Sequence, residues 1–199
     1  HVRRITMKQI IERLNDLQEI ILEPDFTSKK GLGGEIGFYI FDYDAVDELI
    51  VRQAIPDLIQ YSQKRNEALR FQVFDLYDMM IRFFEKRGYI EKNIKMEQQK
   101  SSEELFSVMR KALKIATNRD VFVQMIRDEL EPGAVVFITG IGKIYPILRS
   151  HVLLNNLQIV VEDQPLILFF PGTYEDNKMQ LFGEFKDDHY YRAFQLVGR

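Results

Sequence analysis

Residues 134–143 read Ala-Val-Val-Phe-Ile-Thr-Gly-Ile-Gly-Lys, and this stretch decides the fold class. The run from Ala134 to Thr139 does not alternate apolar with polar residues, which is typical of a strand covered on both faces, as in a parallel sheet. The two glycines allow a tight turn after the strand, and Pro146 suits the first turn of the next helix because it has no amide hydrogen. The stretch therefore predicts one strand–turn–helix unit of a parallel sheet.

The same kind of unit is repeated along the chain. Three other short apolar runs predict strands at residues 36–41, 70–74 and 166–170. Apolar residues recur at helical spacing between these runs, so we expect helices at residues 6–22, 44–59, 76–88, 101–115, 120–131 and 146–157. Pro56 falls inside the second helical pattern, and we expect that helix to be kinked or split there.

Strands that alternate with helices need crossover connections, which place helices on both faces of the sheet. We expect a single three-layer α/β/α domain over residues 1–199, with a mainly parallel central sheet of four to five strands. Residues 179–185 would add an edge strand, and residues 190–197 a last short segment. Residues 91–100 form the most polar stretch and predict an insertion or a mobile connection, whereas residues 1–6 are expected to lack a fixed structure.

Composition excludes several classes of protein. The 199 residues contain no cysteine, which removes disulfide scaffolds, thiolate metal sites and cysteine nucleophiles. The formal charge of -3 argues against a protein that binds a nucleic-acid backbone on its own. Contact with DNA within a larger assembly is still compatible with this charge. No apolar run approaches the roughly 18 residues of a membrane span, and no signal-peptide core is found, so we expect a cytoplasmic protein.

Candidate binding residues lie where the predicted strands end. Ligands of such sheets gather outside the carboxyl ends of the strands. Asp42, Asp44 and Asp75 follow two of the strands, and Pro171 and Gly172 follow a third. The three aspartates also precede predicted helices, where a carboxylate caps free amides, so helix capping and a ligand role are both open.

The loop after the strand at 134–139 contains Gly140, Gly142 and Lys143, which invites a phosphate-binding interpretation. The Walker pattern is not met, because one residue separates the glycines and Ile144 follows the lysine. The dinucleotide pattern is not met either, because Tyr145 stands where the third glycine belongs. A tight strand-to-helix turn is the alternative interpretation. Lys143 and Arg149 are also the best basic candidates for contact with an acidic partner, unless they belong to a solvated helix face.

Aromatic residues gather near the C-terminus. Such a cluster closes the end of a domain, anchors a protein partner or stacks nucleobases. The residues that could form this interface are Tyr174, Tyr190, Tyr191, Arg192 and Phe194.

No complete catalytic constellation is visible. The three histidines, His1, His151 and His189, lack metal-ligand spacing, and no Gly-x-Ser-x-Gly motif occurs. We therefore expect no catalytic residue, no metal and no cofactor.

Several motifs together resemble the BrxB family of bacterial BREX phage-defence systems, over nearly the whole chain. They are Lys-Gly-Leu-Gly-Gly-Glu-Ile at 30–36 before Phe-Asp-Tyr at 41–43, Thr-Gly-Ile-Gly-Lys-Ile-Tyr-Pro at 139–146, Leu-Arg-Ser-His at 148–151, Leu-Asn-Asn-Leu at 154–157, Pro-Gly-Thr-Tyr at 171–174 and Tyr-Tyr-Arg-Ala-Phe at 190–194. The resemblance implies a protein that acts beside a large ATPase, a phosphatase-like protein and an adenine DNA methyltransferase. It implies no catalytic residue.

Three hypotheses follow. The first is a non-enzymatic core subunit that bridges those BREX components. The second is a degenerate nucleotide-binding or phosphoryl-transfer domain that uses Gly140, Gly142, Lys143 and the strand-end aspartates. The third is DNA contact within the assembly, through Lys143, Arg149 and the terminal aromatics.

Overall fold

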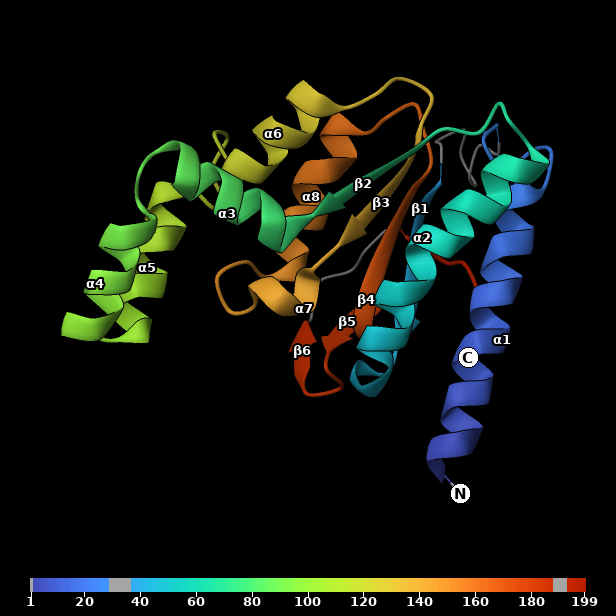
Figure 1. The fold of residues 1–199 in the computed structure, drawn as a ribbon, viewed down its shortest axis with the longest axis horizontal. Helices are drawn as coiled ribbons and strands as arrows, with labels where there is room; N and C mark the ends of the chain where they lie inside the picture. Colours follow the sequence, from blue (N-terminus) through green and yellow to red (C-terminus); the bar gives the residue numbers. More distant parts are fainter. Residues whose placement is uncertain (1, 29–36, 188–192) are drawn as a thin grey trace.

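Five parallel strands form the centre of the computed structural model, which describes residues 2–28, 37–187 and 193–199 (Figure 1). Among these residues the strand order is β2-β3-β4-β1-β7, and every neighbouring pair is parallel. The bounds are β1 (Phe38–Tyr43), β2 (Phe71–Asp75), β3 (Val135–Thr139), β4 (Leu166–Glu175) and β7 (Phe194–Gln195). The predicted mainly parallel sheet is confirmed.

Strand β4 is longer than its sequence suggests. Pro171 and Gly172 were expected at its end, but they lie inside the strand, so that expectation is wrong. The second half of β4 pairs antiparallel with β5 (Lys178–Leu181), which pairs with β6 (Phe185–Asp187). The carbonyl of Pro171 accepts a hydrogen bond of 2.8 Å from the amide of Phe182, so the hairpin supplies the partners that let the strand continue. The expected edge strand at 179–185 is thus a hairpin of two strands.

Two helices cover one face of the sheet. Helix α1 (Val2–Leu22) and helix α2 (Glu48–Arg65), which follows the short 3-10 helix η1 (Ala45–Asp47), contact each other and pack on this face. The strand residues of this core occupy alternate positions, for example Phe137 on β3 and Phe169 on β4. Pro56 lies within α2, which runs unbroken across it, so the helix is not split.

The opposite face carries the other helices. They are α3 (Leu76–Lys86), α5 (Ser102–Ala112), α6 (Val121–Glu129), α7 (Ile141–Ile144) and α8 (Ser150–Val160). The remaining strand positions, such as Phe74 and Ile138, pack against them. With helices on both faces, the three-layer arrangement is confirmed. Pro146 does not begin a helix as expected, since it lies between α7 and α8.

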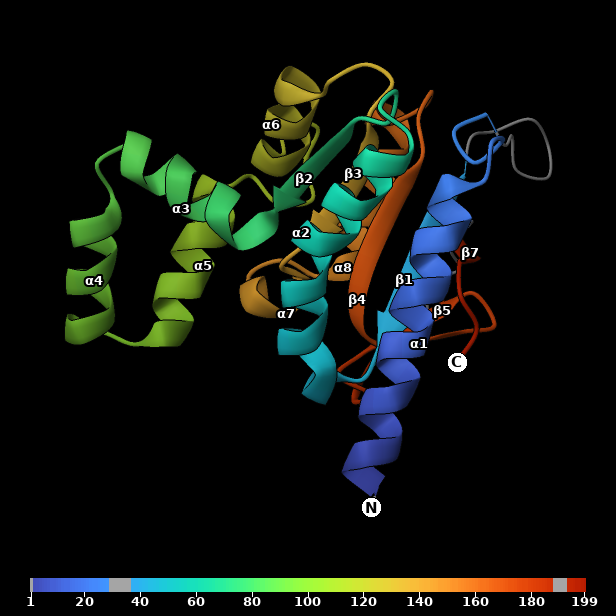
Figure 2. The same ribbon diagram turned by 45° about the vertical axis from the view of Figure 1, so that its right-hand side comes forward.

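The polar stretch at 91–100 forms helix α4 (Ile90–Gln99), none of whose residues is buried. Helix α4 packs on α5, and both views show this pair extending beyond α3, away from the sheet (Figures 1 and 2). At the other end of the chain, α1 begins at Val2, so residues 2–6 are helical. Within the described ranges, none of the helices combines the length and the apolar content that a membrane crossing needs.

The buried carboxylate of Asp42 joins four parts of the chain. Its side chain is fully buried in β1. Its Oδ1 atom accepts hydrogen bonds from Arg13 Nη2 in α1 at 3.2 Å and from Gln195 Nε2 in β7 at 3.0 Å. Its Oδ2 atom accepts from the amide of Tyr174 in β4 at 3.1 Å and from Arg199 Nε at 3.0 Å. One carboxylate therefore holds the N-terminal helix, the sheet and the C-terminal segment together.

Two arginines complete this cluster around Asp42. Arg13 also donates to the carbonyls of Val197 and Gly198, at 3.2 and 3.0 Å. Burial lowers the pKa of Arg13, while the negative charge of Asp42 raises it. Arg199 additionally donates to Asp44 Oδ1 at 2.7 Å. Because both cations rely on the same buried carboxylate, its removal leaves two arginines without their shared partner.

Replacement of Asp42 by asparagine is expected to lower the free energy of unfolding by about 3 kcal/mol, because it leaves buried cationic charge uncompensated. Urea unfolding followed by circular dichroism measures the change. Asp44→Asn is the matched control: its side chain is half exposed, and we expect a loss of about 0.5 kcal/mol. Equal losses in the two variants would contradict the role of Asp42.

Gly172 is expected to tolerate no larger residue. A Cβ atom at this position would lie 2.2 Å from the carbonyl oxygen of Gln180, so the β5 backbone would have to move. We expect Gly172→Ala to lower the free energy of unfolding by about 2 kcal/mol. Gly198→Ala, where a Cβ atom meets nothing within 4 Å, should change it by less than about 0.5 kcal/mol. The same urea titration would refute the close-approach argument if the two alanine variants were equally stable.

Candidate functional site

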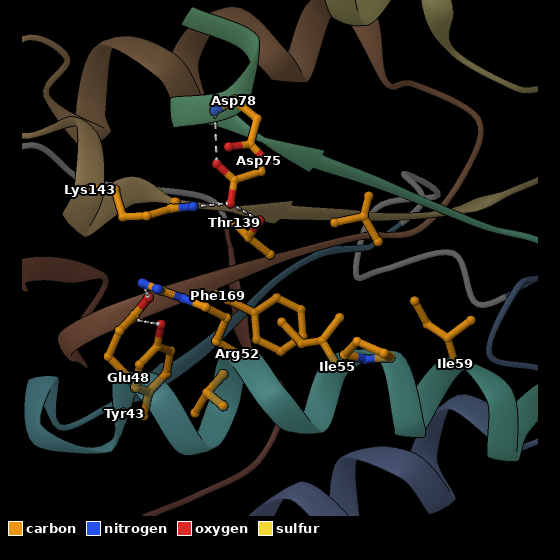
Figure 3. A pocket seen from close by; sticks show the side chains of 14 residues that line it. Tyr43, Glu48, Arg52, Ile55, Ile59, Asp75, Asp78, Thr139, Lys143 and Phe169 are labelled. Atoms are coloured by element: carbon orange, nitrogen blue, oxygen red, sulfur yellow. Dashed lines mark hydrogen bonds and ion pairs between the residues drawn. The ribbon is translucent and has the colours of Figure 1, made fainter. Parts of the chain in front are cut away.

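A cavity of about 510 Å³, here called the α2 cavity, lies between α2 and the carboxyl ends of β1, β2 and β3 (Figure 3). It occupies the edge where ligands of parallel sheets gather. Its residues come from the end of β1, from α2, from the β2–α3 and β3–α7 turns and from β4. The volume lies within the range of small-molecule sites in proteins.

The floor and one wall of the α2 cavity are apolar. Phe169 of β4 forms part of the floor and is almost fully buried. Ile55 and Ile59 of α2 line the wall. Val73 of β2 points to the same face of the sheet, and it remains 43% exposed because β2 is the edge strand and is incompletely covered. The cavity is therefore the space that α2 leaves open beside this edge.

Asp75 organises the rim on the α3 side. Its Oδ1 atom accepts hydrogen bonds from the amides of Tyr77 and Asp78 at 3.0 and 3.1 Å, which caps α3. Its Oδ2 atom accepts from Lys143 Nζ at 2.5 Å and from Thr139 Oγ1 at 3.4 Å. The carboxylate thus joins the β2–α3 turn to the β3–α7 turn, and it neutralises Lys143.

The glycine–lysine loop is a tight turn. Gly140 has a φ of 81°, in the left-handed region, and a Cβ atom there would lie 2.7 Å from Asp75 Oδ1. Gly142 lies against Phe182 and Pro171. Helix α7 is only four residues long. A phosphate at Lys143 would also meet the Asp75 carboxylate, whose negative charge opposes phosphate binding.

A second ion pair lies on the α2 side of the cavity. Glu48 accepts a hydrogen bond of 2.6 Å from the Tyr43 hydroxyl and one of 3.0 Å from Arg52 Nη2. Burial and the neighbouring Glu48 carboxylate raise the pKa of Tyr43 well above its usual value. The phenol therefore stays protonated and acts as a donor. Figure 3 shows this group and the Asp75–Lys143 pair on opposite sides of the cavity.

Of the aspartates singled out by sequence, only Asp75 lines this cavity. Asp42 is buried in β1 and binds the two arginines, so neither helix capping nor a ligand role describes it. Asp44 precedes η1 without a capping side-chain hydrogen bond and pairs with Arg199.

The C-terminal aromatics do not form one described surface. Tyr174 is buried, and its hydroxyl donates to the carbonyl of Ala193 at 2.7 Å, so it serves to close the domain. Phe194 is 41% exposed on β7. Tyr190, Tyr191 and Arg192 lie outside the described residues. Arg149 is exposed at the start of α8 and does not line the α2 cavity.

Sequence reasoning missed the α2 side of the cavity. Tyr43, Glu48, Arg52 and Asp78 all line it, and none was a candidate. The spacing of Glu48 and Arg52 predicts an ion pair on a helix, but it does not say what the helix covers. That depends on the connection from β1 to β2, which passes over two intervening strands.

Among the described residues, no group of three or more histidine, aspartate or glutamate side chains could hold a metal ion. Four of the charged groups that line the α2 cavity are arranged as two ion pairs, and the carboxylate of Asp78 belongs to neither.

Comparison with known proteins gives a consistent result. A family model described as BREX protein BrxB matches residues 72–196. A BREX protein BrxB of Bacillus cereus (strain H3081.97) is 48% identical over 193 residues, which cover 97% of this chain and the full length of the relative. A BREX protein BrxB of Escherichia coli O9:H4 (strain HS) is 33% identical over 187 residues, or 93% of this chain and 90% of the relative. No solved structure matches the chain.

The family model covers more than half of the chain, and both relatives span almost all of it. The chain therefore belongs to the BrxB family and is a component of the BREX phage-defence system.

Proposed function

We propose that the chain is a non-enzymatic core subunit that links other BREX proteins through protein–protein contacts in the bacterial cytoplasm. Membership of the BREX system implies other BREX proteins as partners. The partners in this proposal are the large ATPase, the phosphatase-like protein and the adenine DNA methyltransferase. DNA is reached only through them.

One observation carries the non-enzymatic part of this proposal: four of the charged side chains at the sheet edge are engaged with one another in two ion pairs. Lys143 is paired with Asp75, whose other oxygen caps α3. Glu48 is held by Tyr43 and Arg52. A general acid, base or nucleophile needs a group that can reach the substrate, and activation depends on a suitable neighbour. Here the neighbouring groups already have structural roles: Asp75 caps α3, and Arg52 forms an ion pair with Glu48 along α2.

The helical hairpin of α4 and α5 supports the linking part of the proposal. It extends away from the sheet, as both ribbon views show (Figures 1 and 2). Ile94 on α4 and Val108 on α5 are 50% and 41% exposed. Helix α5 anchors the hairpin in the core through Leu105 and Met109, whereas α4 has no buried residue and is available for contact with another protein.

Co-purification tests the proposal directly. The untagged chain is expressed with each of the three partner proteins in tagged form, and the retained protein is quantified. We expect at least one of the three to retain it at high salt. Retention by none would contradict the linking role. Hydrolysis of ATP or of DNA by the purified chain, abolished by Lys143→Ala or Asp75→Asn, would contradict the non-enzymatic role.

Ile94→Arg is expected to lower retention by the partner at least tenfold, because it places a charge in the exposed apolar surface of the hairpin. Gln99→Arg introduces the same side chain at another exposed position of α4 and should leave retention unchanged. Thermal unfolding provides the folding control for both variants. If Ile94→Arg bound as well as the unaltered chain, the contact surface would lie elsewhere than on this hairpin.

A further inference from the structure

We propose that the α2 cavity binds a cationic side chain, an arginine or lysine that is adjacent to an apolar residue in a partner protein. This inference rests on the proposed linking function and specifies the chemistry of one contact. It differs from the phosphate-binding interpretation of the glycine–lysine loop, since the cavity would accept a cation in place of a phosphate.

The charges that line the α2 cavity do not balance. Within the part of the chain that the structure describes, three carboxylates, those of Glu48, Asp75 and Asp78, face two cations, those of Arg52 and Lys143. Each cation is already within 3.0 Å of one carboxylate. That leaves one carboxylate in excess.

Asp78 is that carboxylate. It has no ion-pair partner among the described residues, and it lies in the first turn of α3. The helix dipole there supplies only about half an elementary charge, so the cavity keeps a net negative charge at neutral pH.

The shape of the α2 cavity suits a long cationic side chain better than a compact ion. Arginine and lysine carry an apolar stem that packs along hydrocarbon surface while the charged group reaches polar partners. Ile55, Ile59 and Phe169 provide that surface, with the carboxylates beside it. The cavity, at about 510 Å³, also has room for an apolar neighbour of the cationic residue, for which exposed Val73 is the contact.

A nucleotide phosphate is disfavoured at the same place. Asp75 Oδ2 accepts a hydrogen bond from Lys143. Asp75 Oδ1 is the atom that would lie closest to a Cβ atom at Gly140. A phosphate that approached this lysine would lie beside the Asp75 carboxylate, whose negative charge repels it. A cation that approaches Asp78 is attracted by the carboxylate.

The test uses the isotope-labelled full chain and three probes. These are N-acetyl-Ala-Leu-Arg-Leu-Ala-amide, the same peptide with glutamate in place of arginine, and ATP with magnesium. We expect the arginine peptide to shift the NMR signals of the Glu48, Asp78 and Thr139 amides at millimolar concentration. The glutamate peptide and ATP should leave these signals unshifted.

Asp78→Asn is expected to weaken binding of the arginine peptide about fivefold, the effect of losing one partly exposed ion pair. Asp57→Asn is the matched control, since it removes the same charge from an exposed position on α2 that does not line the cavity. Absence of shifts with the arginine peptide would overturn the proposal. So would equal shifts with the glutamate peptide, or ATP binding that is lost in Lys143→Ala.

Failure here is distinguishable from failure of the proposed function. If partners retain the chain on the affinity matrix but the arginine peptide does not bind, the cavity proposal fails and the linking role stands. If the arginine peptide binds but no BREX protein retains the chain, the linking role fails, and with it the assignment of the cation to a BREX partner.

Discussion

The placement of one negative charge in the interior constrains the whole molecule. Asp42 has no solvent to stabilise it, so its oxygens must be saturated by donors from the protein. Those donors come from α1, from β7, from the amide of Tyr174 and from Arg199, which are far apart in the sequence. The N-terminal helix can pack on β1 in this way only when the C-terminal segment is also in place. The carboxylate therefore makes the two ends of the described chain cooperative.

The α2 cavity follows from the order of the strands in the sheet. Helix α2 follows β1, which lies next to the edge strand β7, and the chain must then reach the opposite edge strand β2. Helix α2 packs on β3 and β4 on the way and covers β2 incompletely. The gap opens at the carboxyl ends of the strands, where the two turns bring Asp75 and Lys143 together. The chain belongs to the BrxB family, and two ion pairs with one further carboxylate, Asp78, line this edge of its sheet.

The layers and the strands could be predicted from sequence because burial on both faces leaves a local signal. Val135 to Ile138 is apolar without interruption, and the observed strand agrees with it. The helices expected from residues 101 and 120 also begin there, because Ser101 and Asp120 accept hydrogen bonds from backbone amides two or three residues later. The continuation of β4 beyond Gly172 was not predictable, because it depends on a hairpin formed later in the chain. The role of Asp42 was also hidden, since a carboxylate after an apolar run looks the same whether it caps a helix or meets an arginine more than a hundred residues away. The α2 side of the cavity was missed because the strand residues that it faces, such as Thr139 and Phe169, are distant from α2 in the sequence.

Helix α3 connects the α2 cavity to the projecting hairpin of α4 and α5. Its first turn holds Asp75 and Asp78 at the α2 cavity, and its last turn leads directly into α4 and the projecting hairpin. Eleven residues of α-helix span about 16 Å and bend little. One rigid helix, held in the core by Leu76, Met79 and Phe84, therefore fixes the distance between the carboxylates of the α2 cavity and the start of the projecting hairpin.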